Sequence, residues 1–184
     1  MELETKRFYK FLAPRPTVIV TTVDREKNVN AAPFSFVMPV SIEPPLLAVA
    51  LGHKGDTLRN IRDTREFVVN VPPEEILNEL WICSKSHPRG GNELEAAGLM
   101  AVDSEKVLAP YIRECIAWFE CLMENEQELG DHVLVVGRVV HAMVRNDIVK
   151  EDGNMDLKKA KILMHIGGSK FAVAEKEITA KEEE

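Results

Sequence analysis

The chain has 184 residues, of which 45% are hydrophobic and 29% charged, so we expect one soluble globular domain. Its formal net charge of −7 argues against a nucleic-acid-binding protein, which would present a basic face. No apolar run reaches the roughly 18 residues that span a membrane, and the N-terminus has no apolar signal core. We therefore expect a cytoplasmic protein with no membrane partner, with one domain at 1–174 and a charged tail at 175–184.

The first part of the chain predicts a series of short strands. β-branched and apolar residues favour strands at 17–23, 29–34, 36–42, 46–51 and 67–71, separated by polar or proline-containing turns. Between the last two strands the period changes, and Leu58 and Ile61 share one face of a helix expected at 56–65. Asp56 or Thr57 is the expected N-cap of this helix.

The second part combines short helices with two long strands. An amphipathic helix is expected at 74–83, a loop at 84–92, and a helical turn at 93–97 that ends at Gly98. Long strands are expected at 113–123 and 132–144, then a polar connection at 153–161 and an apolar segment at 162–173 that Gly167-Gly168 interrupts. Many short strands with few helices favour an antiparallel β-barrel.

The cysteines and histidines do not form a recognisable metal site. The three cysteines lack C-x-x-C spacing, so neither a disulfide framework nor a zinc cluster is expected. Cys115 and Cys121 are interpreted as packing residues, and Cys83 as the cysteine that could be exposed. The five histidines show no H-x-x-x-H or H-E-x-x-H pairing, so we expect no catalytic zinc.

A candidate anion site lies where the strand at 46–51 leads into the helix at 56–65. Gly52-His53-Lys54-Gly55 connects the two, and a helix N-terminus offers unpaired amides and a positive dipole end to an anion. Lys54 adds a charge and Thr57 a hydroxyl. The alternative interpretation is an ordinary loop with a solvated lysine.

A second candidate site precedes it in the sequence. The small residues of Asn30-Ala31-Ala32-Pro33-Phe34-Ser35-Phe36 would leave backbone amides accessible to a planar ring, and Ser35 can donate or accept a hydrogen bond. A barrel strand at a tight corner explains this stretch equally well. His132, in Gly130-Asp131-His132 at the start of a buried strand, could face a cavity as a donor to a charged ligand, or it could be a hydrogen-bonded histidine on the rim.

The order of these motifs resembles the flavin reductase-like, FMN-binding split-barrel family, and most closely its flavoredoxin-like branch. The similarity covers about Phe11 to Val144, with Gly167-Gly168 also in keeping. One departure is Val37-Met38-Pro39, where the family often has an aromatic residue or asparagine after the Ser-Phe element. The motifs that carry the resemblance are Pro14-Arg15-Pro16, Thr21-Thr22, Asn30 to Phe36, Glu43-Pro44-Pro45, Asp56 to Ile61, Glu66 to Asn70 and Gly130-Asp131-His132 through Gly137-Arg138-Val139.

The resemblance implies a mainly β, antiparallel Greek-key split barrel with flanking helices, and a homodimer that holds FMN near the subunit interface. By position, Asn30, Ala31, Ala32, Pro33, Phe34, Ser35 and Phe36 would line the isoalloxazine, with Ser35 near its polar edge. Ser41 would lie near the ribityl chain, and His53, Lys54 and Thr57 would meet the phosphate. His132 would face the nicotinamide or acceptor. The loop at 85–92 would approach the flavin, from the same or the partner subunit.

The resemblance also implies the activity. We expect an NAD(P)H-dependent flavin or ferric-type reductase that takes hydride from NADH or NADPH and passes electrons to a small-molecule or protein acceptor. Two alternatives remain open: a non-catalytic FMN electron carrier that serves a partner protein, and a flavin-free structural or regulatory barrel. The flavin would supply the redox chemistry, so no side-chain general base is required.

Overall fold

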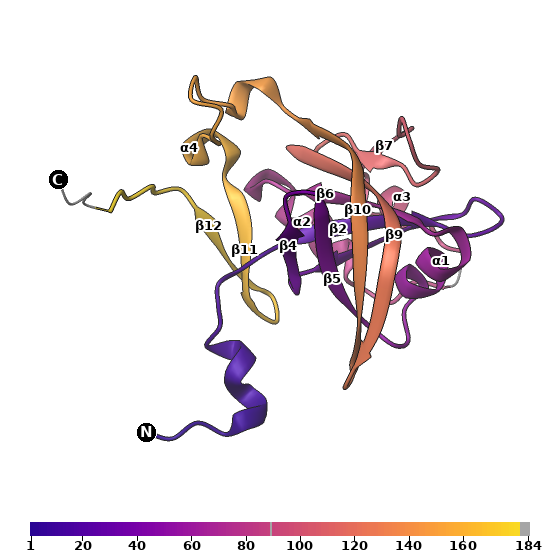
Figure 1. The fold of residues 1–184 in the computed structure, drawn as a ribbon, viewed down its shortest axis with the longest axis horizontal. Coiled ribbons are helices and arrows are strands. Elements are labelled where there is room, and N and C mark those ends of the chain that lie inside the picture. The colour runs from indigo at the N-terminus through magenta and orange to yellow at the C-terminus, as the bar shows by residue number, and fades with distance from the viewer. Residues whose placement is uncertain (89, 181–184) are drawn as a thin grey trace.

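The structure is a computed structural model that describes residues 1–88 and 90–180. Seven strands form one antiparallel sheet in the order β3-β2-β6-β9-β10-β5-β4 (Figure 1). This confirms the predicted mainly β, antiparallel barrel with flanking helices. The bounds of these strands are β2 Val18–Val23, β3 Val29–Phe34, β4 Val37–Ser41, β5 Leu46–Gly52, β6 Glu66–Val71, β9 Ala117–Leu129 and β10 His132–Val144.

Smaller elements surround the sheet. The hairpin of β11 (Ile162–Gly167) and β12 (Lys170–Ala174) lies beside the N-terminal segment, and α1 lies at the opposite side of the molecule (Figure 1). None of the helices in the described part of the chain is both long and apolar enough to cross a bilayer. The remaining elements are η1 Thr5–Lys10, β1 Arg15–Pro16, α1 Asp56–Thr64, η2 Glu74–Ile76, α2 Leu77–Cys83, α3 Glu93–Ala97, β7 Ala101–Val102, β8 Tyr111–Ile112, η3 Asn146–Ile148 and α4 Leu157–Ala160.

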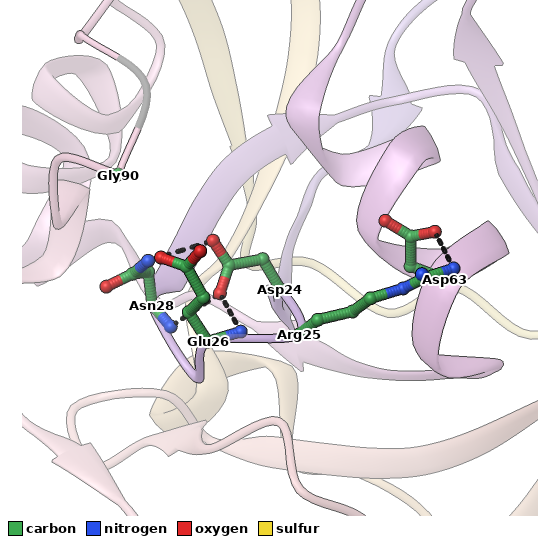
Figure 2. Close-up of a pocket in the computed structure, with 6 residues that line it drawn as sticks. All are labelled: Asp24, Arg25, Glu26, Asn28, Asp63 and Gly90. Atoms are coloured by element: carbon green, nitrogen blue, oxygen red, sulfur yellow. Dashed lines mark hydrogen bonds and ion pairs between the residues drawn. The ribbon is translucent and has the colours of Figure 1, made fainter.

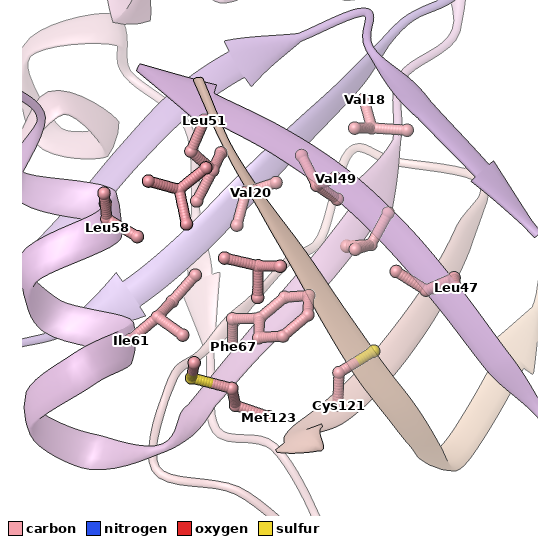
Figure 3. Close-up of a cluster of buried hydrophobic side chains, with 13 residues drawn as sticks. Val18, Val20, Leu47, Val49, Leu51, Leu58, Ile61, Phe67, Cys121 and Met123 are labelled. Carbon is pink, nitrogen blue, oxygen red and sulfur yellow. The ribbon is translucent and has the colours of Figure 1, made fainter. Parts of the chain in front are cut away.

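The sheet curls around a central apolar cluster (Figure 3). Val20 of β2, Val49 of β5 and Phe67 of β6 all belong to this cluster, although β2 and β5 are far apart in the strand order. Leu58 and Ile61 of α1 close one end of it. Ile19 of β2 belongs to a second cluster with α2 and α3, whereas Val18 and Val20 belong to the first, so β2 is buried on both faces.

A glycine in β10 makes room for the central aromatic ring. A Cβ built at Gly137 would lie 2.4 Å from Cζ of Phe67 and 3.1 Å from Cβ of Cys121. The pairing of β10 with β9 also shifts register between Val136 and Gly137. Only a residue without a side chain fits this position without displacement of the Phe67 ring.

A buried carboxylate ties the loop after β7 to the barrel. Glu120 of β9 accepts hydrogen bonds from the backbone amides of Glu105 (3.0 Å) and Lys106 (2.6 Å) and shares one with Nδ1 of His141 (2.9 Å). Burial raises the pKa of Glu120, but these hydrogen bonds outweigh burial and lower the pKa below its usual value.

Several sequence-based expectations differ from the structure. The N-cap of α1 is Gly55, because Asp56 pairs with Arg59 at 2.7 Å and the Thr57 hydroxyl accepts from Asn30 instead. The helix expected at 74–83 is divided into η2 and α2. Residues 175–180 have no regular structure, and 181–184 of the expected tail lie outside the described residues.

The long strand expected from residue 113 begins only at Ala117. A turn precedes it, in which the Cys115 amide donates to the Ile112 carbonyl at 3.2 Å. Cys83 is buried rather than exposed, because it ends α2 against the second cluster. Cys115 and Cys121 are also buried, which agrees with their expected packing role.

Candidate functional site

Two cavities lie on either side of Phe34, at the end of β3. The first has a volume of about 420 Å³ and lies at the start of α1. The second has a volume of about 190 Å³ and lies between the β3–β4 corner, α2 and the β11–β12 hairpin. Phe34 lines both, so the two cavities are neighbours. The first is lined by Phe34, Leu51, Gly52, His53, Lys54, Gly55, Thr57, Leu58 and Asp131.

The first cavity has the features of an anion site. α1 has nine residues and no side-chain N-cap, so its first backbone amides are free to meet a ligand. Lys54 is exposed and makes no ion pair with the residues that the structure describes. A Cβ built at Gly52 would meet no atom within 4 Å, and one at Gly55 would meet only the Gly52 carbonyl oxygen, at 4.0 Å. These glycines leave open space beside the amides and the lysine.

A polar network fixes the Thr57 hydroxyl at the edge of this cavity. Asn30 Nδ2 donates to Thr57 Oγ1 at 3.0 Å and lies 3.3 Å from Thr22 Oγ1. Thr22 Oγ1 also accepts from Asn60 Nδ2 at 3.1 Å. Because Thr57 Oγ1 accepts from Asn30, its own hydrogen can be donated to a ligand.

The second cavity combines aromatic walls with polar groups. Trp81 and Phe171 line it with ring centroids 6.5 Å apart, and Thr17, Ser35 and His165 add polar atoms. The Oγ1 atom of Thr17 is buried and has no hydrogen-bond partner among the described residues. A buried hydroxyl without a partner is unfavourable unless a ligand or water completes it. This cavity therefore suits a flat ligand with polar groups at its edge.

Ser35 belongs to a cluster drawn from three distant segments. Its Oγ lies 3.0 Å from Nδ1 of His165 and 3.5 Å from Nε of Arg15. Nη2 of Arg15 lies 3.3 Å from the same His165 nitrogen. The guanidinium also lies over the ring of Phe36, 5.5 Å from the centroid.

His132 lies at the start of β10, next to Asp131 and opposite Gly52 of β5, two residues that line the first cavity. Its Nδ1 bonds the Asp131 carboxylate at 2.7 Å, and this hydrogen bond lowers the pKa of Asp131. The ring packs beside that of Phe36 with centroids 5.4 Å apart. Because Asp131 engages Nδ1, Nε2 is the nitrogen that can meet a ligand. Nearby, Nε2 of His53 lies 3.1 Å from the Gly130 carbonyl oxygen.

The structure brings together most of the residues that the sequence singled out. Phe34, His53, Lys54 and Thr57 line the first cavity, with Asn30 behind Thr57, and Pro33, Phe34 and Ser35 line the second. Phe36 lines a neighbouring apolar groove of about 370 Å³ on the outer face of β4 and β5.

Three expected residues behave differently. Ala31 is fully buried, and its amide donates to the Glu93 carboxylate at 3.0 Å, whereas Ala32 pairs with Val20 of β2 and lines neither cavity. Ser41 pairs with Leu46, at the opposite end of β5 from Gly52, which is about 20 Å along the strand. The structure therefore brings Ser41 to neither cavity.

Other residues of the site carried no clear signal in the sequence. Thr17 lies just before β2, Trp81 in α2 and His165 in β11, and the fold brings these three segments together at the second cavity. Arg15 was visible only as part of a proline-rich motif. Ser84, which lines the second cavity, immediately precedes the loop at 85–92 that is expected to approach the flavin. In that loop, Lys85 Nζ lies 4.4 Å from the Trp81 ring centroid, and Arg89 lies outside the described residues.

A larger cavity, of about 600 Å³, lies elsewhere, at the turn between β2 and β3 (Figure 2). Among the residues that the structure describes, three carboxylates (Asp24, Glu26 and Asp63) and one guanidinium line it, and that guanidinium, of Arg25, pairs with Asp63 at 2.8 Å. Asp24 accepts hydrogen bonds within its own turn from the amides of Glu26 and Asn28. Three carboxylates facing one cation would repel a phosphate, so this cavity does not suit a nucleotide.

Known proteins resemble the chain along most of its length. Residues 11–173 match the family described as the flavin reductase like domain. The NADH-dependent FMN reductase AsuE2 of Streptomyces nodosus subsp. asukaensis is 35% identical over 135 residues, which are 72% of this chain and 71% of that protein.

Two solved structures have the same fold. Nitrilotriacetate monooxygenase component B of Bacillus cereus matches with a TM-score of 0.89 and 28% identity, and the match covers 97% of this chain and 95% of the component B chain. Flavoredoxin of Desulfovibrio vulgaris (Miyazaki F) matches with a TM-score of 0.82 and 23% identity, and the match covers 91% of this chain and 90% of the flavoredoxin chain.

Proposed function

The chain belongs to the flavin reductase-like domain family, and from this premise we propose that it binds FMN and reduces it with NADH or NADPH. The electrons then pass to a small-molecule or protein acceptor. The observation that carries this proposal is the pair of cavities that meet at Phe34. One offers a lysine and free helix amides, and the other offers aromatic walls with polar groups.

The residues present suit FMN at both ends. The phosphate would lie at the start of α1, where Lys54, the Thr57 hydroxyl and His53 surround space left open by Gly52 and Gly55. The ring would lie toward Phe34 and Ser35, where the unpartnered Thr17 hydroxyl can be satisfied by a polar ring edge. We expect a ligand with one terminal phosphate, because Lys54 and the start of α1 provide binding groups for one phosphate at that end.

When bound, the flavin supplies the redox chemistry, accepting hydride from a nicotinamide and passing electrons onward. The protein's part is to bind, to orient and to exclude water. His132 can hold the nucleotide or the acceptor through Nε2, because Asp131 fixes the ring through Nδ1. His132 is the residue we assign to this contact.

We also propose a homodimer. β4 is an edge strand of the sheet, and it carries exposed apolar side chains, with Met38 52% and Val40 43% exposed. The apolar groove that Phe36 lines runs along the same face. A second copy would cover this face, as two-fold dimers commonly do. Analytical sedimentation would report the oligomeric state in solution. A monomer that still binds FMN tightly would contradict the proposal.

The identity of the flavin tests the proposal directly. The purified protein would be reconstituted with FMN and with FAD, separated from free flavin, denatured, and the released flavin identified. We expect FMN to be retained in preference to FAD. Retention of FAD alone, or of neither flavin, would refute the proposed cofactor.

A further inference from the structure

The hydrogen bonds around Ser35 determine whether its hydroxyl can act as a donor or as an acceptor toward a ligand. The atoms come from β1 (Arg15), the β3–β4 corner (Ser35) and β11 (His165), and Arg15 pairs directly with His165 in the β1–β11 ladder. Arg15 is itself held in place, because its Nη1 donates to the carbonyl oxygens of Tyr9 at 2.6 Å and Leu12 at 3.1 Å.

The same contacts define the tautomer of His165. Its Nε2 lies 3.1 Å from the carbonyl oxygen of Gly168, which can only accept, so Nε2 carries the hydrogen. Its Nδ1 lies 3.3 Å from Nη2 of Arg15, which can only donate. Nδ1 is therefore an acceptor and the imidazole is neutral, since an imidazolium would set two donors against each other. We assign these hydrogens from the network of partners.

Because Nδ1 has one lone pair, Arg15 and Ser35 share it, and the shorter contact, from Ser35 Oγ, makes Ser35 the main donor. The Oγ–Nδ1 distance of 3.0 Å is that of a normal hydrogen bond. Oγ then has only lone pairs left for other partners. One of them faces Nε of Arg15 at 3.5 Å, and Ser35 itself lines the second cavity. A ligand in this cavity would meet Ser35 as an acceptor.

We propose that Arg15 and His165 are positioning residues that hold the Ser35 hydroxyl as an acceptor for an N–H group that the flavin gains on reduction, so that the site binds reduced flavin more tightly than oxidised flavin. The chemical reason is that a reduced isoalloxazine carries more N–H groups than an oxidised one, and an acceptor complements them. The inference rests on the proposed function, because it requires FMN beside Ser35.

The test compares affinities for the two redox states in four variants. Oxidised FMN affinity comes from a fluorescence titration, and the midpoint potential of bound FMN from anaerobic equilibration with a reference dye. Ser35→Ala removes the acceptor. His165→Phe frees the Ser35 hydrogen, whereas His165→Asn keeps an acceptor oxygen near the place of Nδ1. The double variant Ser35→Ala/His165→Phe tests whether His165 acts through Ser35.

We expect Ser35→Ala and His165→Phe each to lower the preference for reduced flavin about tenfold, a fall of about 30 mV in a two-electron midpoint potential. His165→Asn should retain most of the wild-type preference, and the double variant should match Ser35→Ala. Unfolding temperatures are measured alongside, because a purely structural role would change these without changing the potential.

Two results would overturn the inference. One is a His165→Phe potential equal to that of the wild type, and the other is a double variant whose effects add. If His165→Phe does not fold, an unchanged potential in Ser35→Ala overturns it equally. A wild-type protein that binds no FMN would instead refute the proposed function, and this inference with it.

Discussion

Lys54 gives the sharpest test of the proposed phosphate site. It lies in the loop between β5 and α1, lines the first cavity, and has no ion-pair partner among the residues that the structure describes. Lys54→Ala therefore removes one cation without leaving a buried carboxylate unpaired. We expect the variant to fold as the wild type does and to bind FMN more weakly.

The exposure of Lys54 sets the size of the effect. A hydrogen bond to a charged group typically contributes about 1.5–3 kcal/mol, and solvent screens an exposed lysine, so we expect the lower end of this range. A loss of about 1.5 kcal/mol corresponds to roughly tenfold in Kd. The difference should shrink as the salt concentration rises, because the interaction is electrostatic.

The assay is a titration of flavin fluorescence quenching at low and at high salt. Lys158→Ala is the matched control, because Lys158 is an exposed lysine of α4 far along the chain from the cavity. The control should bind FMN as the wild type does. Equal affinities for Lys54→Ala and wild type would refute the assignment of Lys54 to the phosphate.

Three further predictions concern the fold. Gly137→Ala should destabilise the protein by about 1–3 kcal/mol, since its Cβ would lie 2.4 Å from a packed ring, whereas Gly167→Ala, with no atom within 4 Å, should have little effect in the same urea titration. Glu120→Gln should lower the free energy of unfolding by about 1–3 kcal/mol at neutral pH. The folded-state pKa of Glu120 is lowered, so its ionised form stabilises the protein above the unfolded pKa, and this contribution is lost as pH falls through the folded pKa. The difference in the free energy of unfolding between wild type and Glu120→Gln should therefore become smaller as the pH falls. A difference that stays constant with pH would contradict the stabilising role of the ionised Glu120. Cys83 should resist a thiol reagent at mildly alkaline pH until the protein unfolds, because burial raises its pKa to about 12; rapid labelling of the native protein would contradict this.

The sequence predicted the features that depend on neighbouring residues. The strands at 29–34 and 132–144 begin and end as expected, and in the second of them β-branched and apolar residues favour a strand. The grouping of Lys54 and Gly55 at the start of α1 was also predictable, since these residues are consecutive, and its role as an anion site stays a prediction. Within such a short segment, local geometry determines which groups lie together.

The second cavity was less predictable, because it is assembled from distant segments. Ser35 meets His165 only through the pairing of β1 with β11, in which Arg15 lies opposite His165. In the sequence, His165 is one residue within an apolar run, and periodicity gives no sign of its partners. Ser41 was expected by the ribityl chain, and its pairing with Leu46 places it at the end of β5 opposite Gly52, so its contact with a ligand stays a prediction.

The central claim is that the protein binds FMN and that a nicotinamide nucleotide reduces it. Its most direct test is the visible absorbance of the FMN-loaded protein during anaerobic titration with NADH and, separately, with NADPH. We expect at least one nucleotide to bleach the flavin in proportion to the amount added. Bound flavin that dithionite bleaches, but neither nucleotide does, would contradict the claim and indicate an electron carrier instead.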